Sequence, residues 1–391
     1  MGQNAKGGRE RAQSRSSGTA GRRAPRPVAL DDINAEAAGW LFDLAALQDA
    51  EHRRHAYTRA AYAVMGTPHS LRELRDAHEL QSLRYIGPSS ARVLEEVLAT
   101  GRSATVDAAI AARGAESAVA ARRAARRGFL SMAAAETVLA SRRPGAVGLA
   151  DYRGDLQMHS VWSDGGQSLE TIVQTGLQLG YQYAAVTDHS YGLPVARGMT
   201  MEAASRQHAA IDALNREYDG RFVLLKGIEA NILADGATDL TPDERLAFEI
   251  VVAAPHSALR GTADQTARMV AAVSQPGVDI LGHPRGRKYN GRAGVRADWA
   301  LVFAAAAANG VAVEIDGSPE RQDVDWELAE MAWRAGCLLA LDSDGHAPHE
   351  LLFARLAVAH ARLAGIPPDR VVNCWPVSEL RAWSASRRER G

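Results

Sequence analysis

Apolar residues along the chain recur with two different spacings, and the change between them divides the chain into two regions. In the first region they recur every three or four residues, beginning with Ile33, Ala37, Trp40, Leu41, Leu44 and Leu47. This spacing predicts amphipathic helices. From about residue 154 onward, short runs of Val, Ile, Leu and Ala alternate with helical patterns, which is typical of an α/β fold.

The first region is predicted to be all-helical. Asp31 or Asp32 can cap its first helix, and Gly66-Thr67-Pro68 ends the second. Helices are expected at residues 33–47, 55–65 and 70–77, then as a short pair within 78–101 and as an Ala- and Arg-rich helix within 102–150. Pro144-Gly145 and Gly148 mark a linker to the second region.

The segment 78–101 resembles a helix-hairpin-helix motif, with Gly87-Pro88-Ser89 at its turn. Backbone N–H groups at such a turn bind phosphate without reading base sequence. Together with A-Y-T-R-A-A-Y at residues 56–62, this region resembles the small N-terminal DNA-binding domain of family X DNA polymerases. The resemblance implies DNA contacts by Gly87, Ser89 and Ser90, whereas the alternative is a helical bundle without a ligand. Two arginines of the following helix, Arg122 and Arg126, are either phosphate contacts or part of a solvated face.

The second region contains seven strand-helix units, which predict a parallel α/β barrel of the TIM type. Strands are expected at residues 154–158, 183–187, 222–228, 249–254, 278–282, 311–315 and 338–342. Helices are expected at 167–180, 200–218, 262–273, 297–309, 325–335 and 350–364. In such barrels the site lies at the carboxyl ends of the strands.

Side chains that can bind metals follow these strands one after another. They are five histidines and three acids: His159, His189, His256, His283, His346, Asp164, Glu229 and Asp344. Nitrogen and carboxylate oxygen without thiolate suit Zn²⁺, Mn²⁺ or Fe²⁺. Because eight ligands exceed the capacity of one ion, we expect two or three divalent ions bridged by a carboxylate. Asp188, Asp342 and His208 are expected to lie outside this ligand set.

These motifs resemble the PHP (polymerase and histidinol phosphatase) family, over more than half of the chain and in the same order. The matching pieces are D-L-Q-M-H-S-V-W-S-D-G (155–165), A-V-T-D-H-S (185–190), G-I-E-A-N-I-L (227–233), A-A-P-H-S (253–257), I-L-G-H-P (280–284), V-E-I-D-G-S-P-E-R (313–321) and D-S-D-G-H (342–346). The resemblance implies a distorted seven-stranded barrel, the PHP fold, with a trinuclear metal site that hydrolyses phosphoesters. It makes the eight residues metal ligands, Glu229 their bridge, and Glu229, His189 and Asp344 catalytic.

One position departs from the family pattern, because its first motif is usually H-x-H and the first position here is Gln157. An amide oxygen is a weaker, uncharged donor, so one ion of the site is expected to bind less tightly. Four basic residues follow strand ends and are candidates for holding phosphate oxygens, with solvated loop charges as the alternative: Arg285, Arg287, Lys288 and Arg321.

Charge is distributed unevenly along the chain. Residues 1–150 carry 22 Lys and Arg against 15 Asp and Glu, whereas residues 151–391 carry 23 against 31. This indicates a basic, polyanion-facing part joined to an acidic one. We expect a disordered basic tail at residues 1–28, a helical DNA-binding region at 29–150 and a metallohydrolase domain at 151–391. Two distant cysteines, no apolar run long enough for a membrane and no signal sequence predict a cytoplasmic protein.

About 50 residues separate the hairpin from the barrel, too few for a nucleotidyltransferase domain. The leading hypothesis is therefore a metal-dependent phosphoric ester hydrolase that acts on DNA 3′ ends, as an exonuclease or a 3′-phosphatase in repair. The first alternative is a small-molecule phosphatase similar to histidinol phosphatase. The second is a non-catalytic DNA-binding or scaffold protein with a metal site impaired at Gln157.

Overall fold

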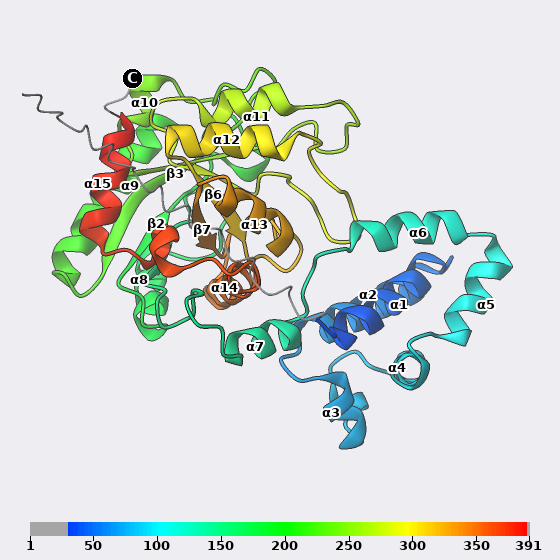
Figure 1. Cartoon of the computed structure of the whole chain (residues 1–391). Coiled ribbons are helices and arrows are strands. Elements are labelled where there is room, and N and C mark those ends of the chain that lie inside the picture. Colours follow the sequence, from blue (N-terminus) through cyan, green and yellow to red (C-terminus); the bar gives the residue numbers. More distant parts are fainter. Residues whose placement is uncertain (1–29, 389–391) are drawn as a thin grey trace, which may run out of the picture.

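The computed structural model of the protein describes residues 30–388, so the basic tail predicted for residues 1–28 lies outside the described residues. The helices of the first region pack against one side of a barrel, where α7 (Met132–Ala140) lies beside α14 (Ala354–Leu363) (Figure 1). Among residues 30–388, no helix is long and apolar enough to span a membrane.

The first region is helical as predicted. Besides α7 it contains α1 (Ile33–Ala46), α2 (Glu51–Gly66), α3 (Leu71–Asp76), the 3₁₀ turn η1 (Leu80–Ser82), α4 (Pro88–Thr100), α5 (Ala104–Arg113) and α6 (Glu116–Ala125). Asp32 caps α1, because its Oδ1 accepts the Ala35 N–H at 2.9 Å. The same carboxylate accepts the backbone N–H and the hydroxyl of Ser131 at 2.7 and 2.6 Å, which ties the start of α1 to the start of α7.

The predicted hairpin lies between η1 and α4. Gly87 precedes α4 without a side-chain cap, and Pro88 occupies the first helical position. A backbone N–H at this position makes no hydrogen bond within the helix, so proline causes no loss there. Gly101 ends α4 in a left-handed conformation (φ 73°) that an L-residue with a side chain adopts only under strain. The first arm of the hairpin is only a 3₁₀ turn, shorter than the helix that the sequence predicts.

Seven parallel strands form the barrel in sequence order, each paired with the next. Their bounds are β1 (Gly154–Asp155), β2 (Tyr183–Val186), β3 (Val223–Asn231), β4 (Ile250–Ala254), β5 (Ile280–Leu281), β6 (Ala312–Asp316) and β7 (Leu338–Asp342). A parallel bridge between Met158 and Gly345 joins the extensions of the first and last strands. The predicted seven-stranded barrel is confirmed.

Helices cover the outside of the barrel at the predicted places. They are α8 (Leu169–Gln178), α9 (Met201–Tyr218), α11 (Thr266–Val273), α12 (Trp299–Asn309), α13 (Trp326–Arg334) and α14. The short α10 (Pro242–Arg245) and the last helix α15 (Val377–Arg388) were not predicted, because the apolar repeat of each segment is too brief to identify it.

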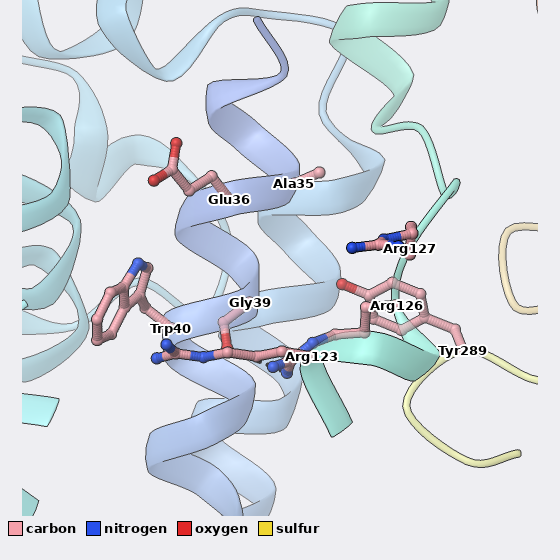
Figure 2. A pocket seen from close by; sticks show the side chains of 8 residues that line it. All are labelled: Ala35, Glu36, Gly39, Trp40, Arg123, Arg126, Arg127 and Tyr289. Atoms are coloured by element: carbon pink, nitrogen blue, oxygen red, sulfur yellow. Dashed lines mark hydrogen bonds between the residues drawn. The ribbon is translucent and has the colours of Figure 1, made fainter. Parts of the chain in front are cut away.

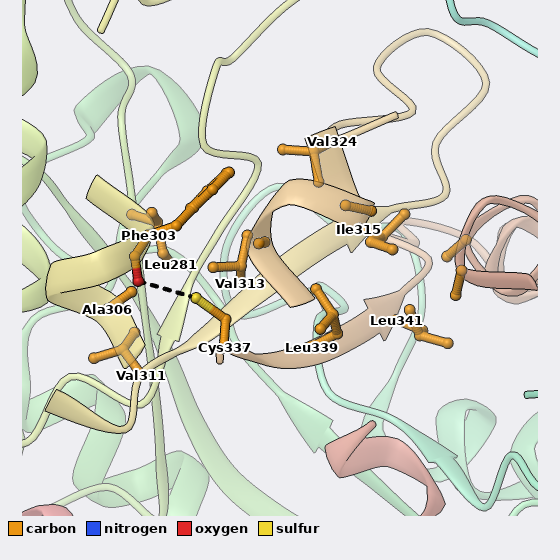
Figure 3. Packing of buried hydrophobic residues seen from close by; sticks show 14 of the residues in the cluster. Leu281, Phe303, Ala306, Val311, Val313, Ile315, Val324, Cys337, Leu339 and Leu341 are labelled. Atoms are coloured by element: carbon orange, nitrogen blue, oxygen red, sulfur yellow. Dashed lines mark hydrogen bonds between the residues drawn. The ribbon is translucent and has the colours of Figure 1, made fainter. Parts of the chain in front are cut away.

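Alternate strand residues divide the core into an inner and an outer layer. Val313, Leu339 and Leu341 point outward and pack against helices such as α12, which contributes Phe303 (Figure 3). The Cys337 thiol lies in the same layer and donates to the Phe303 carbonyl at 3.2 Å. Each fully buried side chain of this size stabilises the fold by roughly 1.5–3 kcal/mol.

The helical region and the barrel meet at a buried seam. Tyr289, from the loop after β5, packs edge-on against Phe42 and Phe129 of the helical region, with ring centroids 5.2 and 4.8 Å away. Arg287 lies 3.9 Å above the Phe129 ring and donates to the carbonyls of Arg127 and Gly128, both at 3.1 Å. We propose that this seam separates two domains, residues 29–150 and 151–391.

A second part of the seam follows the loop after β6. The Gln322 amide makes two hydrogen bonds to the Leu130 backbone, at 2.8 and 2.9 Å. Its oxygen also accepts the Nε2–H of buried His360 at 2.8 Å. Arg355 of α14 pairs with Glu136 of α7 through two hydrogen bonds, one of 2.7 Å. The helical region is therefore held by specific polar contacts as well as by apolar packing.

Candidate metal centre

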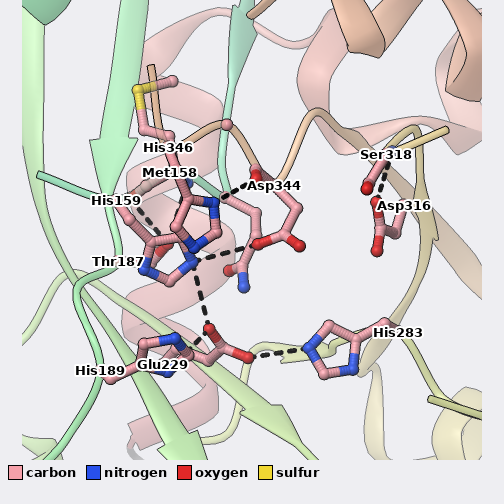
Figure 4. A network of polar contacts seen from close by, with 12 residues as sticks. Met158, His159, Thr187, His189, Glu229, His283, Asp316, Ser318, Asp344 and His346 are labelled. Carbon is pink, nitrogen blue, oxygen red and sulfur yellow. Dashed lines mark hydrogen bonds and ion pairs between the residues drawn. The ribbon is translucent and has the colours of Figure 1, made fainter. Parts of the chain in front are cut away.

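The predicted ligands converge at one end of the barrel. His159 follows β1, His189 follows β2, Glu229 lies near the end of β3, and His283 follows β5. Because the strands are parallel, their carboxyl ends meet at the same rim. Figure 4 shows these side chains pointing toward one another, together with Asp344 from the segment after β7.

Glu229 lies at the middle of the group and is almost completely buried. Its Oε2 lies 3.3 Å from His159 Nε2 and 3.2 Å from His189 Nδ1. Its Oε1 lies 3.2 Å from His256 Nε2 and 2.9 Å from His283 Nε2. Each carboxylate oxygen thus faces two imidazoles, which is the placement expected of a bridging ligand.

The donors form three overlapping groups in which the ligand atoms lie within 4.8 Å of one another. The groups are His159, Asp164, His189 and His346; His189, Glu229 and His256; and His159, Glu229 and Asp344. His159, His189 and Glu229 each belong to two groups, so neighbouring ions would share ligands. His283 contacts Glu229 but falls outside these groups.

Hydrogen bonds orient two of the histidines so that Nε2 faces the centre. His346 Nδ1 donates to the Asp344 carbonyl at 2.8 Å, and His256 Nδ1 lies 3.2 Å from the Asn231 side-chain oxygen. With the proton on Nδ1, each ring presents the Nε2 lone pair to the centre, and such partners fix the tautomer of metal-binding histidines. The sequence pattern did not single out Asn231, although it stands two residues after Glu229 on the same strand.

The carboxylates of the centre are in their charged form at neutral pH. Burial raises the pKa of Asp164, but the neighbouring imidazoles outweigh it and lower the value to about 2. Burial also raises the pKa of Asp344, yet Arg321 and His159 hold it well below its usual range. The pKa of Glu229 is likewise held well below its usual range by the surrounding imidazoles, against the effect of burial.

The histidines respond to this negative charge in different ways. Burial lowers the pKa of His189 to about 4, so this ring is neutral and can donate a lone pair. Burial also lowers the pKa of His159, but Asp344 and Glu229 reverse the effect and raise it well above its usual value. Two carboxylates therefore favour a positive charge at the position that His159 Nε2 faces.

Several buried polar atoms of the centre have no hydrogen-bond partner within residues 30–388. They include Glu229 Oε2, His189 Nδ1, His256 Nε2 and both polar atoms of the Gln157 side chain. Leaving such atoms unpaired costs free energy that metal coordination can offset. With nitrogen and oxygen donors and no thiolate, the group fits two or three divalent cations such as Zn²⁺ or Mn²⁺.

Gln157 stands where the family pattern has a histidine, and it is completely buried. Its backbone carbonyl accepts the Asp344 N–H at 3.0 Å, which places Gln157 beside the segment that carries Asp344 and His346. The role of its amide oxygen as a weak ligand stays a prediction.

Buried acids support the ligands without joining the three groups. Asp188 accepts the Ser160 N–H at 2.8 Å and the Gln207 amide at 2.6 Å, and so holds the segment that carries His159. Glu314 accepts the backbone N–H of His283. Asp342 accepts from Leu156 N and from Asn373, each at 2.8 Å. His208 is half-buried and packs edge-on against Phe248, with ring centroids 5.1 Å apart. It belongs to none of the three donor groups, as predicted.

The four candidate phosphate ligands are placed very differently from one another. Arg321 Nη1 lies 2.5 Å from Asp344 Oδ2, beside the centre. Lys288 pairs with Glu320 at 2.7 Å on the same rim. Arg285 instead pairs with Asp323 and Asp325 at 2.8 and 2.9 Å, and Arg287 holds the seam. The structure does not bring Arg285 and Arg287 to the centre, because buried acids and carbonyls already occupy their donors.

The candidate DNA contacts also divide into exposed and paired groups. Gly87 and Ser89 are exposed at the start of α4, whereas the Ser90 side chain is buried. Arg122 is half-buried on α6. The Arg126 guanidinium is paired with buried Asp43 and donates to the Gly39 carbonyl at 3.1 Å, so its donors are engaged within the fold.

A cavity of about 410 Å³ lies beside Arg126, between α1 and the loop of Tyr289. Figure 2 shows Trp40, Arg123 and Arg126 along it, where Arg123 stacks 4.3 Å from the Trp40 ring. Arg123 also pairs with Asp43 at 2.7 Å. These arginines therefore join α6 to α1, and the sequence pattern alone would not distinguish them from a DNA-binding row.

Comparisons with known proteins match both regions of the chain. A family model described as a helix-hairpin-helix domain matches residues 32–103. The DNA polymerase/3′-5′ exonuclease PolX of Bacillus subtilis is 35% identical over 236 residues, which are 60% of this chain but only 41% of that protein. The Probable phosphatase YcdX of Escherichia coli is 30% identical over 238 residues, which are 58% of this chain and 91% of that protein.

Among solved structures, a histidinol phosphate phosphatase of Lactococcus lactis, complexed with zinc, L-histidinol and phosphate, matches with a TM-score of 0.40 and 15% identity. The match covers 54% of this chain and 94% of that one.

Proposed function

Because the chain belongs to the PHP (polymerase and histidinol phosphatase) family of metal-dependent phosphoesterases, we propose that it hydrolyses phosphoesters at the 3′ ends of DNA, as an exonuclease or a 3′-phosphatase in repair. One observation carries this proposal. The region that matches a helix-hairpin-helix domain packs against the barrel that carries the candidate metal centre, with Phe42 against Tyr289 and Tyr62 beside Glu320. A module able to hold the DNA backbone would thus be fixed relative to the centre.

The residues of the chain take distinct parts in the proposed reaction. The eight predicted ligands would hold two or three divalent ions, which supply water activation and charge stabilisation at phosphorus. Glu229 would be shared between neighbouring ions, since each of its oxygens faces two imidazoles. Burial lowers the pKa of Arg321, but Asp344 and Asp316 reverse this and keep it charged, so it can hold phosphoryl oxygens. We therefore propose Arg321, with Lys288 at the rim, as the phosphate-holding group.

The proposal is tested with the purified full chain, Mn²⁺ or Zn²⁺, and a single strand labelled near its 3′ end. We expect stepwise loss of nucleotides, or loss of phosphate alone from a strand that ends in a 3′-phosphate. His189→Ala should abolish either activity, whereas Glu217→Ala, an exposed change on α9, should not. An unchanged strand in both metals would exclude action on DNA ends.

A small-molecule phosphatase is the second candidate, because the match to YcdX extends over 91% of that protein. It predicts turnover of histidinol phosphate and similar monoesters without binding of DNA to the helical region. The non-catalytic alternative predicts no hydrolysis of any of these substrates and no more than substoichiometric metal, measured as ions per chain.

A further inference from the structure

A cavity of about 420 Å³ opens beside the metal centre, and the helical region forms part of its wall. Arg321, Asp344 and His346 line the end next to the centre. Tyr62 of α2 and Phe353 of the barrel also line it. An aromatic ring from the helical region therefore shares one cavity with two of the metal ligands.

The Tyr62 ring is held in place yet reachable. It packs edge-on against Phe42 with ring centroids 5.0 Å apart, and Phe42 in turn packs against Tyr289 of the seam. The side chain is nevertheless 38% exposed. A ring fixed on one side and open on the other loses little conformational freedom when a planar ligand stacks on it.

Polar contacts connect this ring to the centre. The Tyr62 hydroxyl lies 3.5 Å from Glu320 Oε1, and Glu320 also pairs with Lys288. The next residue, Arg321, meets Asp344. Burial, aided by Glu320, raises the pKa of Tyr62 to about 12, so its hydroxyl remains a donor at neutral pH. One short segment thus carries both the phosphate-holding group and the partner of the ring.

We propose that this cavity seats the terminal nucleotide of the strand, with its base stacked on Tyr62 and its phosphate held by Arg321 at the centre. The inference rests on the proposed function and adds the substrate class: a nucleotide that carries an intact base. A planar π-system and an anion are the two features that this cavity recognises, and a nucleotide joins them in one molecule. Tyr62 is therefore a specificity-determining residue that the helical region contributes.

The decisive experiment compares two strands that differ only at the terminal residue, which carries a base in one and is a tetrahydrofuran abasic site in the other. Tyr62→Ala should lower kcat/KM on the first strand by roughly 5- to 150-fold, the range for loss of one base-aromatic stack, and leave the second within about twofold. Tyr62→Phe keeps the ring and should resemble the wild type on both strands. Equal loss on the two strands, no loss, or loss in Tyr62→Phe would overturn the inference.

A binding arm separates this inference from the proposed function. Calorimetry with the full chain and Mn²⁺ should show that deoxyadenosine monophosphate binds more tightly than deoxyribose 5-phosphate, and that Tyr62→Ala removes the difference. Tyr85→Ala, a change of a similarly exposed ring outside the cavity, should leave it intact. If the wild type degrades no strand but still binds the nucleotide more tightly than the sugar phosphate, the base-binding site is supported and the proposed action on DNA is wrong. If the two ligands bind equally well, the seat itself is wrong.

Discussion

The barrel rim and the seam with the helical region are both rich in charged side chains, but they use the charges in opposite ways. At the rim, Glu229 faces four imidazoles, and several buried polar atoms have no hydrogen-bond partner in the described part of the chain. At the seam, Arg285 and Arg287 meet Asp323, Asp325 and backbone carbonyls, so most donors are paired. Buried polar atoms without a hydrogen-bond partner indicate a site for a ligand. Buried charged groups that pair with one another are part of the fold.

The comparison predicts that the largest loss of activity comes from the middle of the rim. Glu229→Ala removes a carboxylate whose two oxygens each face two imidazoles. We expect hydrolysis to fall by more than the roughly 10- to 100-fold that loss of an outer-shell partner typically costs. Metal content per chain should fall with it, as measured by elemental analysis. Retention of both activity and metal would show that Glu229 does not bridge the ions.

Replacement of the seam arginine should reduce stability instead. Arg287→Ala leaves Asp325 and the carbonyls of Arg127 and Gly128 with fewer donors, so the free energy of unfolding should fall by about 3–5 kcal/mol. Denaturant unfolding measures this loss. The matched control is Arg206→Ala, because Arg206 pairs with Glu202 on the exposed face of α9 and should contribute less than about 1 kcal/mol. Equal losses in the two variants would remove the distinction between seam and surface.

Arg321→Ala tests the same residue type at the rim. Loss of a group that contacts the reacting phosphate should lower kcat/KM by roughly 10²- to 10³-fold. The free energy of unfolding should change much less than in Arg287→Ala, since the Arg321 side chain is partly exposed. A stability loss as large as that of Arg287→Ala would assign Arg321 to the seam.

The seam also predicts a dependence of stability on pH through His360. Burial, with Arg287 nearby, lowers the pKa of this imidazole to about 3, against about 6.5 in the unfolded chain. Between these values the unfolded state binds the extra proton, so the contribution of His360 is complete above about pH 6.5 and declines as the pH falls toward 3. Unfolding between pH 5 and 8 should show a steeper decline for the wild type than for His360→Gln. Identical slopes would contradict the assigned pKa.

The smallest effect is expected where the rim departs from its family. Gln157→His places an imidazole where the amide has no hydrogen-bond partner among the described residues, so the chain should retain Zn²⁺ or Mn²⁺ against a chelator about 10-fold better. Metal retained after dialysis at graded chelator concentrations measures this change. Unchanged retention would mean that Gln157 does not face an ion.

The barrel and the convergence of the candidate ligands could be predicted because each signal is local. His159, His189 and His283 each follow a strand within four residues, and parallel strands necessarily bring their ends to one rim. The supporting residues were less visible. Asn231 and Gln207 are recognised only through the side chains that they contact, and these lie 25 and 19 residues away in sequence.

The order of strands, the metal-binding residue types and the weak point at Gln157 follow from the chain read in sequence, because spacing and side-chain chemistry are properties of short segments. Which arginine lies beside the metal centre and which forms ion pairs away from it depends on partners that only tertiary packing supplies. Arg285 and Arg321 look alike in sequence, yet the first meets buried Asp323 and the second meets Asp344. Tertiary packing also determines the place of Tyr62 in the cavity, because α2 packs against the barrel and brings Tyr62 beside Glu320, 258 positions later in the sequence.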